Sequence, residues 1–200
     1  MHLTIFDIPV LRDIMRGLAL LILKICGWRR EGKLPDIPKY IMIAAPHTSN
    51  WDLLFTMAVA LAFRLKICWM GKHTLFRRPF GPLLCLLGGI PIDRTKSRDT
   101  VAQIVQAFRE RARMVMIISP EGTRKKVKVW KTGFYHIARG ADVPVLLAFL
   151  DYMKKVGGFG PLIYLSESLE ADMAVIRSFY ATVTPRHPEK TCLAAVVSVN

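Results

Sequence analysis

The chain has 200 residues, enough for one domain with a sizeable hydrophobic core. Hydrophobic residues make up 52% of it and charged residues 22%, a mixture typical of proteins that work at a membrane surface. The 29 Lys and Arg residues against 15 Asp and Glu give a formal charge of +14, so we expect an anionic partner: phospholipid headgroups, a phosphorylated substrate, an acidic carrier protein or nucleic acid. Because the basic residues cluster beside aromatic and apolar ones, a merely solubilising surface charge is the weaker interpretation.

The cysteines and histidines argue against a metal centre. The four cysteines are widely spaced without a C-x-x-C pair, and the five histidines form no H-x-x-x-H pattern. We therefore expect no metal site, and we interpret the cysteines as reduced residues of a cytosolic protein: Cys26, Cys68, Cys85 and Cys192.

Apolar residues near the N-terminus predict an amphipathic helix of about five turns, because they recur at steps of three and four. The uninterrupted apolar run Leu18–Leu23 is far too short to span a bilayer. We expect residues 8–30 to lie in a membrane interface, with Trp28 and the two arginines that follow it as a headgroup anchor. A core-packing helix and a secretory signal are the alternatives, although Lys24 interrupts the apolar run and no small-x-small cleavage site follows. The helix pattern consists of Leu11, Ile14, Met15, Leu18, Leu21, Ile22 and Ile25.

A histidine and a carboxylate follow the next expected element, a short buried strand at Tyr40–Ala44. His47 and Asp52 are five residues apart, so on one continuous helix their side chains would point roughly 140° apart. If His47 lies on the loop after the strand and Asp52 in the first turn of a helix over 51–65, the imidazole can reach the carboxylate. Such a dyad leaves one ring nitrogen free to accept a proton. The structural alternative makes Ser49 the helix cap and Asp52 its capping-box partner, and both can hold at once.

The middle of the chain carries a basic and aromatic run. After a strand expected at 66–70, cations alternate with aromatic residues over 72–82, a composition that suits a lipid surface or single-stranded nucleic acid. The apolar stretch Leu83–Leu87 that follows favours lipid. A strand then ends in the charged pair Asp93 and Arg94.

A second strand-to-turn junction offers a phosphate site. Met114–Ile118 is a fully apolar strand of the kind buried in a parallel sheet, and it leads into a turn that contains Gly122. Such a turn presents backbone N–H groups, and Arg124 adds a planar, bidentate phosphate donor. The signal of this turn by itself is weak.

The rest of the chain continues the alternation of strands and helices. This pattern predicts an α/β fold with a mostly parallel central sheet flanked by helices. We expect a single domain over residues 1–200, with a catalytic core at about 40–182. The expected elements are a helix over 97–113, a helix Thr132–Arg139 that Gly140 stops, a strand Val143–Leu150, a basic glycine-rich turn 154–160, a strand 162–165 and a helix 169–182.

Four blocks, taken in order, resemble the glycerolipid acyltransferases, whose best-known branch is the lysophosphatidate (1-acylglycerol-3-phosphate) acyltransferases. They are His47-x4-Asp52, then 89–94, 120–124 and 143–145. The chain departs from the family pattern in having Pro46 before the histidine, Ser119 in place of an aromatic residue and Leu147 in place of a second proline.

The resemblance implies transfer of a fatty acyl group from acyl-CoA or acyl-ACP, as co-substrate, to a lysolipid hydroxyl, and we expect 1-acylglycerol-3-phosphate as the acceptor. His47 would be the general base and Asp52 would orient it. The chain has no G-x-S-x-G elbow, which favours direct attack, and no cofactor is expected. The resemblance also implies a protein bound peripherally or monotopically to the cytoplasmic face of the cell membrane.

The same resemblance assigns the acceptor phosphate to Arg94, Gly122, Thr123 and Arg124, with Lys72 and Arg77 as weaker candidates. Glu121 would position the acceptor or the loop, or be a structural partner of a nearby arginine. One alternative keeps the chemistry and changes the acceptor to a lyso-ornithine lipid or another lysophospholipid. Another is a non-catalytic basic module that binds membrane or nucleic acid, although no nucleic-acid module signature accompanies the charge, so we expect no nucleic-acid partner.

Overall fold

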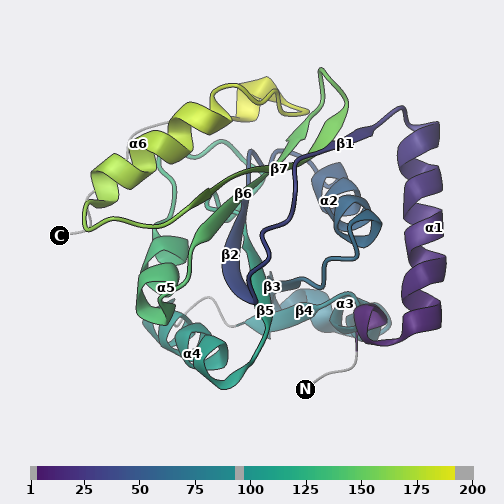
Figure 1. Ribbon diagram of the computed structural model, residues 1–200, viewed down its shortest axis with the longest axis horizontal. Coiled ribbons are helices and arrows are strands. Elements are labelled where there is room, and N and C mark those ends of the chain that lie inside the picture. Colours follow the sequence, from purple (N-terminus) through teal and green to yellow (C-terminus); the bar gives the residue numbers. More distant parts are fainter. Residues whose placement is uncertain (1–3, 93–96, 192–200) are drawn as a thin grey trace.

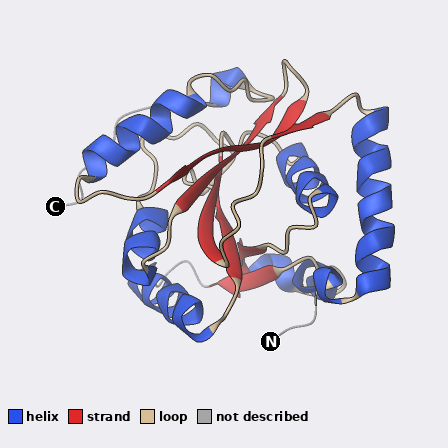
Figure 2. Ribbon diagram, viewed as in Figure 1, coloured by secondary structure: helices blue, strands red, loops and turns tan. Residues whose placement is uncertain are grey.

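A sheet of seven strands forms the centre of the described part of the chain, residues 4–92 and 97–191 of this computed structural model (Figures 1 and 2). All neighbouring strands pair in parallel except one antiparallel pair, so the predicted mostly parallel sheet is confirmed. From edge to edge the strands are β1 (Arg29–Glu31), β7 (Val156–Ile163), β6 (Val145–Asp151), β2 (Lys39–Ala44), β5 (Met114–Ile118), β3 (Cys68–Lys72) and β4 (Gly89–Ile92), with β6 and β7 antiparallel.

Helices cover both faces of the sheet, as Figure 1 shows. One hydrophobic core lies between the sheet and the first three helices, and a second core lies between the sheet and the last three. Within the described residues the helices are α1 (Pro9–Ile25), α2 (Trp51–Ala62), α3 (Gly81–Leu86), α4 (Ser97–Glu110), α5 (Gly133–Ala141) and α6 (Leu169–Tyr180), with short 3-10 turns at η1 (Ile5–Asp7), η2 (His73–Phe76) and η3 (Pro188–Lys190).

The central strand β2 shows why its apolar run is continuous. Alternate side chains of a strand point to opposite faces. Tyr40 and Met42 therefore enter the core beneath α2, whereas Ile41 and Ile43 enter the core on the other face. Because both faces are covered, every position needs an apolar side chain, which is the pattern expected of a buried parallel strand.

The helix α1 is present as predicted and begins with a proline at its first position. One face packs on α2: Ala19 and Leu23 are buried, and Arg16 Nε donates to the Ala62 carbonyl at 3.1 Å. The opposite face exposes large apolar side chains to solvent. Among the described residues, no helix has both the length and the apolar character needed to cross a bilayer. The exposed stripe, which we call the α1 stripe, consists of Val10, Ile14, Leu18, Leu21 and Ile25.

Trp28 does not act as an exposed headgroup anchor, so this prediction was wrong. Its side chain is only 8% exposed, and its ring stacks on Phe55 of α2 with 4.5 Å between centroids. The chain turns at Gly27, whose φ of +72° favours glycine, and then enters β1, which directs the indole into the core. The two arginines after it lie exposed in β1.

Two glycine assignments also need correction. The segment predicted as a glycine-rich turn is strand β7 from Val156 onward, and its glycines admit the neighbouring strand: a Cβ on Gly158 would lie 1.9 Å from the Glu31 carbonyl oxygen. Gly140 does not stop its helix. It lies inside α5, where a Cβ would lie 2.9 Å from Val105 of α4, and Asp142, with φ of 52°, ends the helix instead. Both glycines are explained by packing.

Smaller boundary shifts remain. The predicted helix over 51–65 ends at Ala62, the strand expected at 66–70 begins at Cys68, and the strand expected at 162–165 is part of β7.

Candidate active site

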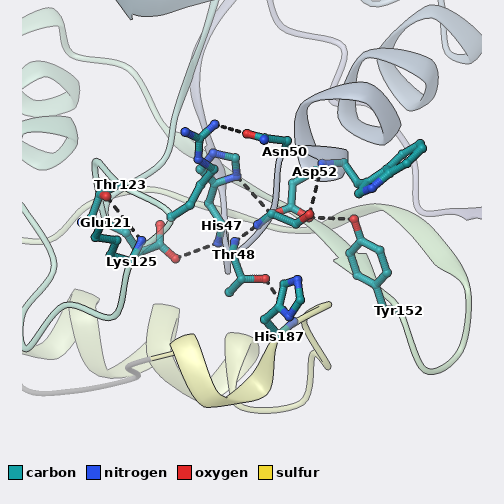
Figure 3. A network of polar contacts seen from close by, with 12 residues as sticks. His47, Thr48, Asn50, Asp52, Glu121, Thr123, Lys125, Tyr152 and His187 are labelled. Carbon is teal, nitrogen blue, oxygen red and sulfur yellow. Dashed lines mark hydrogen bonds and ion pairs between the residues drawn. The ribbon is translucent and has the colours of Figure 1, made fainter.

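The structure brings His47 and Asp52 together (Figure 3). His47 lies on the loop that leaves β2, and Asp52 lies in the first turn of α2. The distance from His47 Nδ1 to Asp52 Oδ2 is 3.1 Å. The same carboxylate oxygen accepts the backbone N–H groups of Thr48 and Ser49, at 2.7 and 2.8 Å. Asp52 therefore accepts hydrogen bonds from backbone N–H groups just before the helix and also contacts the imidazole. The N-cap residue of α2 is Asn50, whose side chain makes no capping hydrogen bond.

Asp52 is ionised at neutral pH. Burial raises its pKa, but hydrogen bonds from His47, Tyr152 and two backbone N–H groups outweigh burial and lower the pKa overall. An ionised carboxylate accepts hydrogen bonds, so Nδ1 of His47 carries the proton. Nε2 has no partner among the described residues, and the His47 side chain is 25% exposed. The imidazole is thus held in the tautomer whose outer nitrogen can accept a proton.

Tyr152 is a member of the site that sequence reasoning missed. Its hydroxyl donates to the second carboxylate oxygen, Asp52 Oδ1, at 2.7 Å (Figure 3). Burial and the negative charge of Asp52 raise the pKa of Tyr152, so the hydroxyl keeps its proton and remains a donor. Tyr152 lies directly after β6, 100 residues from its partner. The only available signal was its position behind a strand that carries one of the four blocks.

Glu121 supports the histidine loop from the other side. Its Oε1 accepts the backbone N–H of His47 at 3.0 Å, and the residue is 7% exposed. Burial raises the pKa of Glu121. Its second oxygen, Oε2, is buried without a hydrogen-bond partner in the described structure, where no arginine forms an ion pair with it either. The predicted positioning role for the loop therefore fits the geometry better than the arginine pairing.

A basic cavity of about 650 Å³ opens beside the dyad. Arg124 reaches across it and donates to the Asn50 side-chain oxygen. Three segments build the walls: the loop after β2, the loop after β5 and residues 187–190, near the C-terminus. The cavity is lined by Thr48, Ser49, Asn50, Thr123, Arg124, Lys125, Lys126, His187 and Lys190.

The other predicted acceptor residues lie around this cavity or outside it. Gly122 occupies the turn after β5 with φ of +63°, a conformation that favours glycine. Lys72 ends β3, at the same carboxyl edge as His47 and Arg124, but does not line the cavity. Arg77 is exposed. Arg94 lies outside the described residues. Ligand sites of parallel α/β sheets lie at this carboxyl edge.

Residues 186–190, near the C-terminus, complete the site, and sequence reasoning missed them. The His187 backbone N–H donates to Thr48 Oγ1 at 3.3 Å. The guanidinium of Arg186 lies 5.4 Å from the ring centroid of Trp51 and 5.8 Å from that of Tyr152. These contacts hold the segment against the start of α2, where Lys190 joins the cavity wall.

Residues 29–147, from β1 into β6, match a family model described as Acyltransferase. The chain belongs to the acyltransferase family. Over 109 residues, the chain is 34% identical to the 1-acyl-sn-glycerol-3-phosphate acyltransferase of Escherichia coli (strain K12). That similarity covers 51% of this chain and 43% of the relative, so the matched part is less than half of the relative's length.

A solved structure supports the fold of this chain. The 1-acyl-sn-glycerophosphate (LPA) acyltransferase PlsC from Thermotoga maritima superposes with a TM-score of 0.59. The similarity covers 88% of this chain and 81% of that one, at 16% sequence identity. The α/β architecture predicted from the order of strands and helices is therefore shared with a known acyltransferase.

Proposed function

We propose that this acyltransferase moves a fatty acyl group from a thioester to the hydroxyl of 1-acylglycerol-3-phosphate, in phospholipid biosynthesis. The observation that carries the proposal is the dyad: Asp52 fixes His47 Nδ1, and Nε2, beside a basic cavity, has no hydrogen-bond partner within residues 4–92 and 97–191. The acceptor class is supported by the relative from Escherichia coli, which is named for that substrate.

The reaction follows from the position of the free nitrogen. His47 Nε2 takes the proton of the acceptor hydroxyl as its oxygen attacks the thioester carbonyl. The C–S bond of the tetrahedral intermediate then breaks, and the imidazolium returns the proton to the leaving thiolate. Asp52 stabilises the imidazolium between these steps. The proton that His47 takes from the hydroxyl is the one that it gives to the thiolate, and no acyl-enzyme is formed.

The acceptor phosphate is assigned to the turn after β5. Arg124 provides a bidentate donor, and Gly122 and Thr123 shape the turn before it. Lys72 at the end of β3 adds a second cation on the side of β5 away from β2, and Arg94 is proposed as a third. Glu121 acts through the loop, because it holds the His47 backbone rather than the reacting atoms.

The proposed membrane partner is bound through α1. The α1 stripe exposes Ile14 at 62% and Ile25 at 75%, and the helix also carries Arg12 and Lys24. Apolar side chains flanked by cations suit an anionic lipid surface. We propose peripheral or monotopic binding at the cytoplasmic face of the cell membrane, where the acceptor lipid resides.

The test is acyl transfer by the purified protein from a labelled acyl thioester to a panel of lysolipids. The proposal expects product from 1-acylglycerol-3-phosphate, with the Michaelis constant for this acceptor raised roughly tenfold or more in Arg124→Gln. Product only from lyso-ornithine lipid or a lysophospholipid with another headgroup would contradict the proposed acceptor. No transfer to any acceptor would contradict the reaction.

A further inference from the structure

The segment from η2 to α3 has no part in the proposed reaction. It covers the same face of the sheet as α1 and α2, and Leu86 of α3 packs against the same hydrophobic core (Figure 1). Three large apolar side chains of this short segment are exposed: Leu75 at 56%, Phe80 at 67% and Leu83 at 53%. Large apolar side chains that are exposed together, beside polar residues, mark an interaction surface.

The inner side of the segment is tightly packed by other residues. The ring of Phe76 lies where a Cβ on Gly71 of β3 or on Gly89 of β4 would be 2.7 Å from it. A Cβ on Gly81, the first residue of α3, would lie 1.9 Å from the Phe76 carbonyl oxygen. The indole N–H of Trp69 donates, at 3.0 Å, to the carbonyl of the residue that follows α3. The segment is therefore fixed on β3 and β4, and its three exposed apolar side chains remain outside the core.

The charged residues of this segment are all basic. No Asp or Glu occurs from residue 72 to residue 92, a stretch that contains Lys72, Arg77 and Arg78. Arg77 and Arg78 are exposed, and in the described part of the chain neither forms an ion pair. Cations beside exposed apolar side chains are typical of surfaces that bind anionic lipid.

We propose that a second membrane contact, which binds an anionic phospholipid surface, is formed by Leu75, Arg77, Arg78, Phe80 and Leu83. We call these residues the η2–α3 patch. The proposal rests on the proposed membrane partner of α1 and deepens it. The apolar side chains enter the boundary between headgroups and acyl chains, and the guanidinium groups pair with lipid phosphates. A second copy of this chain is a poor occupant, because its formal charge of +14 repels the same cations.

The second contact determines which edge of the sheet faces the membrane. A single interfacial helix restrains rotation about its own axis only weakly, and a contact away from that axis restrains it further. The η2 turn follows the carboxyl end of β3, and the loop with His47 lies at the same edge of the sheet. Binding through both α1 and the η2–α3 patch therefore brings the edge that carries the dyad to the bilayer that holds the acceptor.

The experiment measures partition of the full chain into vesicles by sedimentation, which requires no turnover. One set of vesicles contains phosphatidylglycerol and phosphatidylcholine, and the other contains phosphatidylcholine alone. One variant carries Phe80→Asp with Leu83→Asp and tests the apolar part of the patch. The other carries Arg77→Gln with Arg78→Gln and tests its charge.

Each variant has a control matched in side-chain type. Met153→Asp with Val175→Asp adds the same charge at two exposed apolar residues outside the patch. Lys33→Gln with Arg113→Gln removes the same charge from two exposed cations outside it. Circular dichroism on all four proteins verifies the fold, which the substitutions should preserve because every changed side chain is exposed.

We expect the aspartate variant of the patch to lower partition into both kinds of vesicle, by about tenfold or more, because it removes two apolar contacts. Each cation near an anionic leaflet contributes roughly fivefold, so the glutamine variant should lower partition into the anionic vesicles about tenfold or more. Its partition into neutral vesicles should match the wild type, and its defect should shrink at high salt. Both controls should stay close to the wild type.

Four results would overturn the proposal. Both patch variants could bind like the wild type while Leu18→Asp with Leu21→Asp is released, which would leave α1 as the membrane contact. Equal losses in the controls would assign the effect to net charge. Dissociation of a wild-type oligomer in the patch variants, with vesicle binding retained, would assign the patch to a protein interface. Absence of vesicle binding by the wild type would overturn the membrane partner of α1 as well.

A failure of the proposed reaction is distinguishable from these results, because partition is measured without substrates. If the wild type transfers no acyl group while the patch variants show the expected losses, the reaction fails and the second membrane contact stands.

Discussion

Replacing Tyr152 with phenylalanine removes one atom from the site. The lost hydroxyl donates to Asp52 Oδ1 at 2.7 Å. The ring itself packs with its edge against Trp28, at 5.0 Å between centroids, and against Phe55, at 6.2 Å. A phenylalanine ring keeps these contacts, so the variant isolates the hydrogen bond from the packing.

The expected loss of stability follows from the charge of the acceptor. A hydrogen bond to a charged group contributes about 1.5–3 kcal/mol. Tyr152 is half-buried, so water can replace part of this bond, and we expect a loss of about 1–2 kcal/mol at pH 7. The folded state lowers the pKa of Asp52 below its ordinary 3.8, so the carboxylate stabilises the fold above that pH. This contribution disappears as the pH falls through the pKa that Asp52 has in the folded protein. The difference in stability between the wild type and Tyr152→Phe disappears with it.

The same bond restrains the dyad. Without it Asp52 keeps its three donors on Oδ2, namely His47 and two backbone N–H groups, and can rotate more freely. We expect kcat to fall about tenfold, because the imidazole is less well oriented.

The assay pairs denaturant unfolding at several pH values with kcat for acyl transfer. Tyr135→Phe is the matched control, because its hydroxyl makes an equally part-buried bond, to the Ser166 carbonyl at 3.2 Å, away from the dyad. The control should lose some stability and leave kcat unchanged. An unchanged kcat together with unchanged stability in Tyr152→Phe would refute the reasoning.

Three further predictions concern burial and surface. Trp28→Ala should destabilise the fold by about 3–5 kcal/mol in denaturant unfolding, because the indole is buried. If Trp28 were an exposed headgroup anchor, the same substitution would weaken vesicle binding and leave the stability unchanged. Glu121→Gln should abolish a stability loss that the wild type shows as pH rises from about 4.5 through the raised pKa; thermal melts that keep the same pH slope would contradict this. Leu18→Asp with Leu21→Asp should release the protein from anionic vesicles in sedimentation, while Met153→Asp, at a more exposed apolar residue outside the α1 stripe, stays bound.

The parts of the site that sequence reasoning found are local. His47 and Asp52 are five residues apart, and the strand, loop and helix pattern around them decides whether they meet. The strand β5 was predicted with its observed bounds, because five consecutive apolar residues admit little other than a buried strand.

The missed parts depend on contacts between distant segments. Tyr152 and His187 reach the dyad loop only after β6 and the C-terminal segment pack against α2, and no spacing in the chain encodes that contact. Trp28 was misassigned because an indole beside two arginines suits a headgroup layer and a core edge equally. The stacking partner Phe55 decides between them, and it lies on another helix.

The central claim is that His47 is the base of an acyl transfer. Its most direct test compares the wild type with His47→Ala in transfer of a labelled acyl group to 1-acylglycerol-3-phosphate, with circular dichroism and vesicle binding measured on both. We predict a loss of about 10²–10⁴-fold in rate with unchanged fold and membrane association, as expected when a general base is removed. Transfer by the variant at the rate of the wild type would contradict the claim.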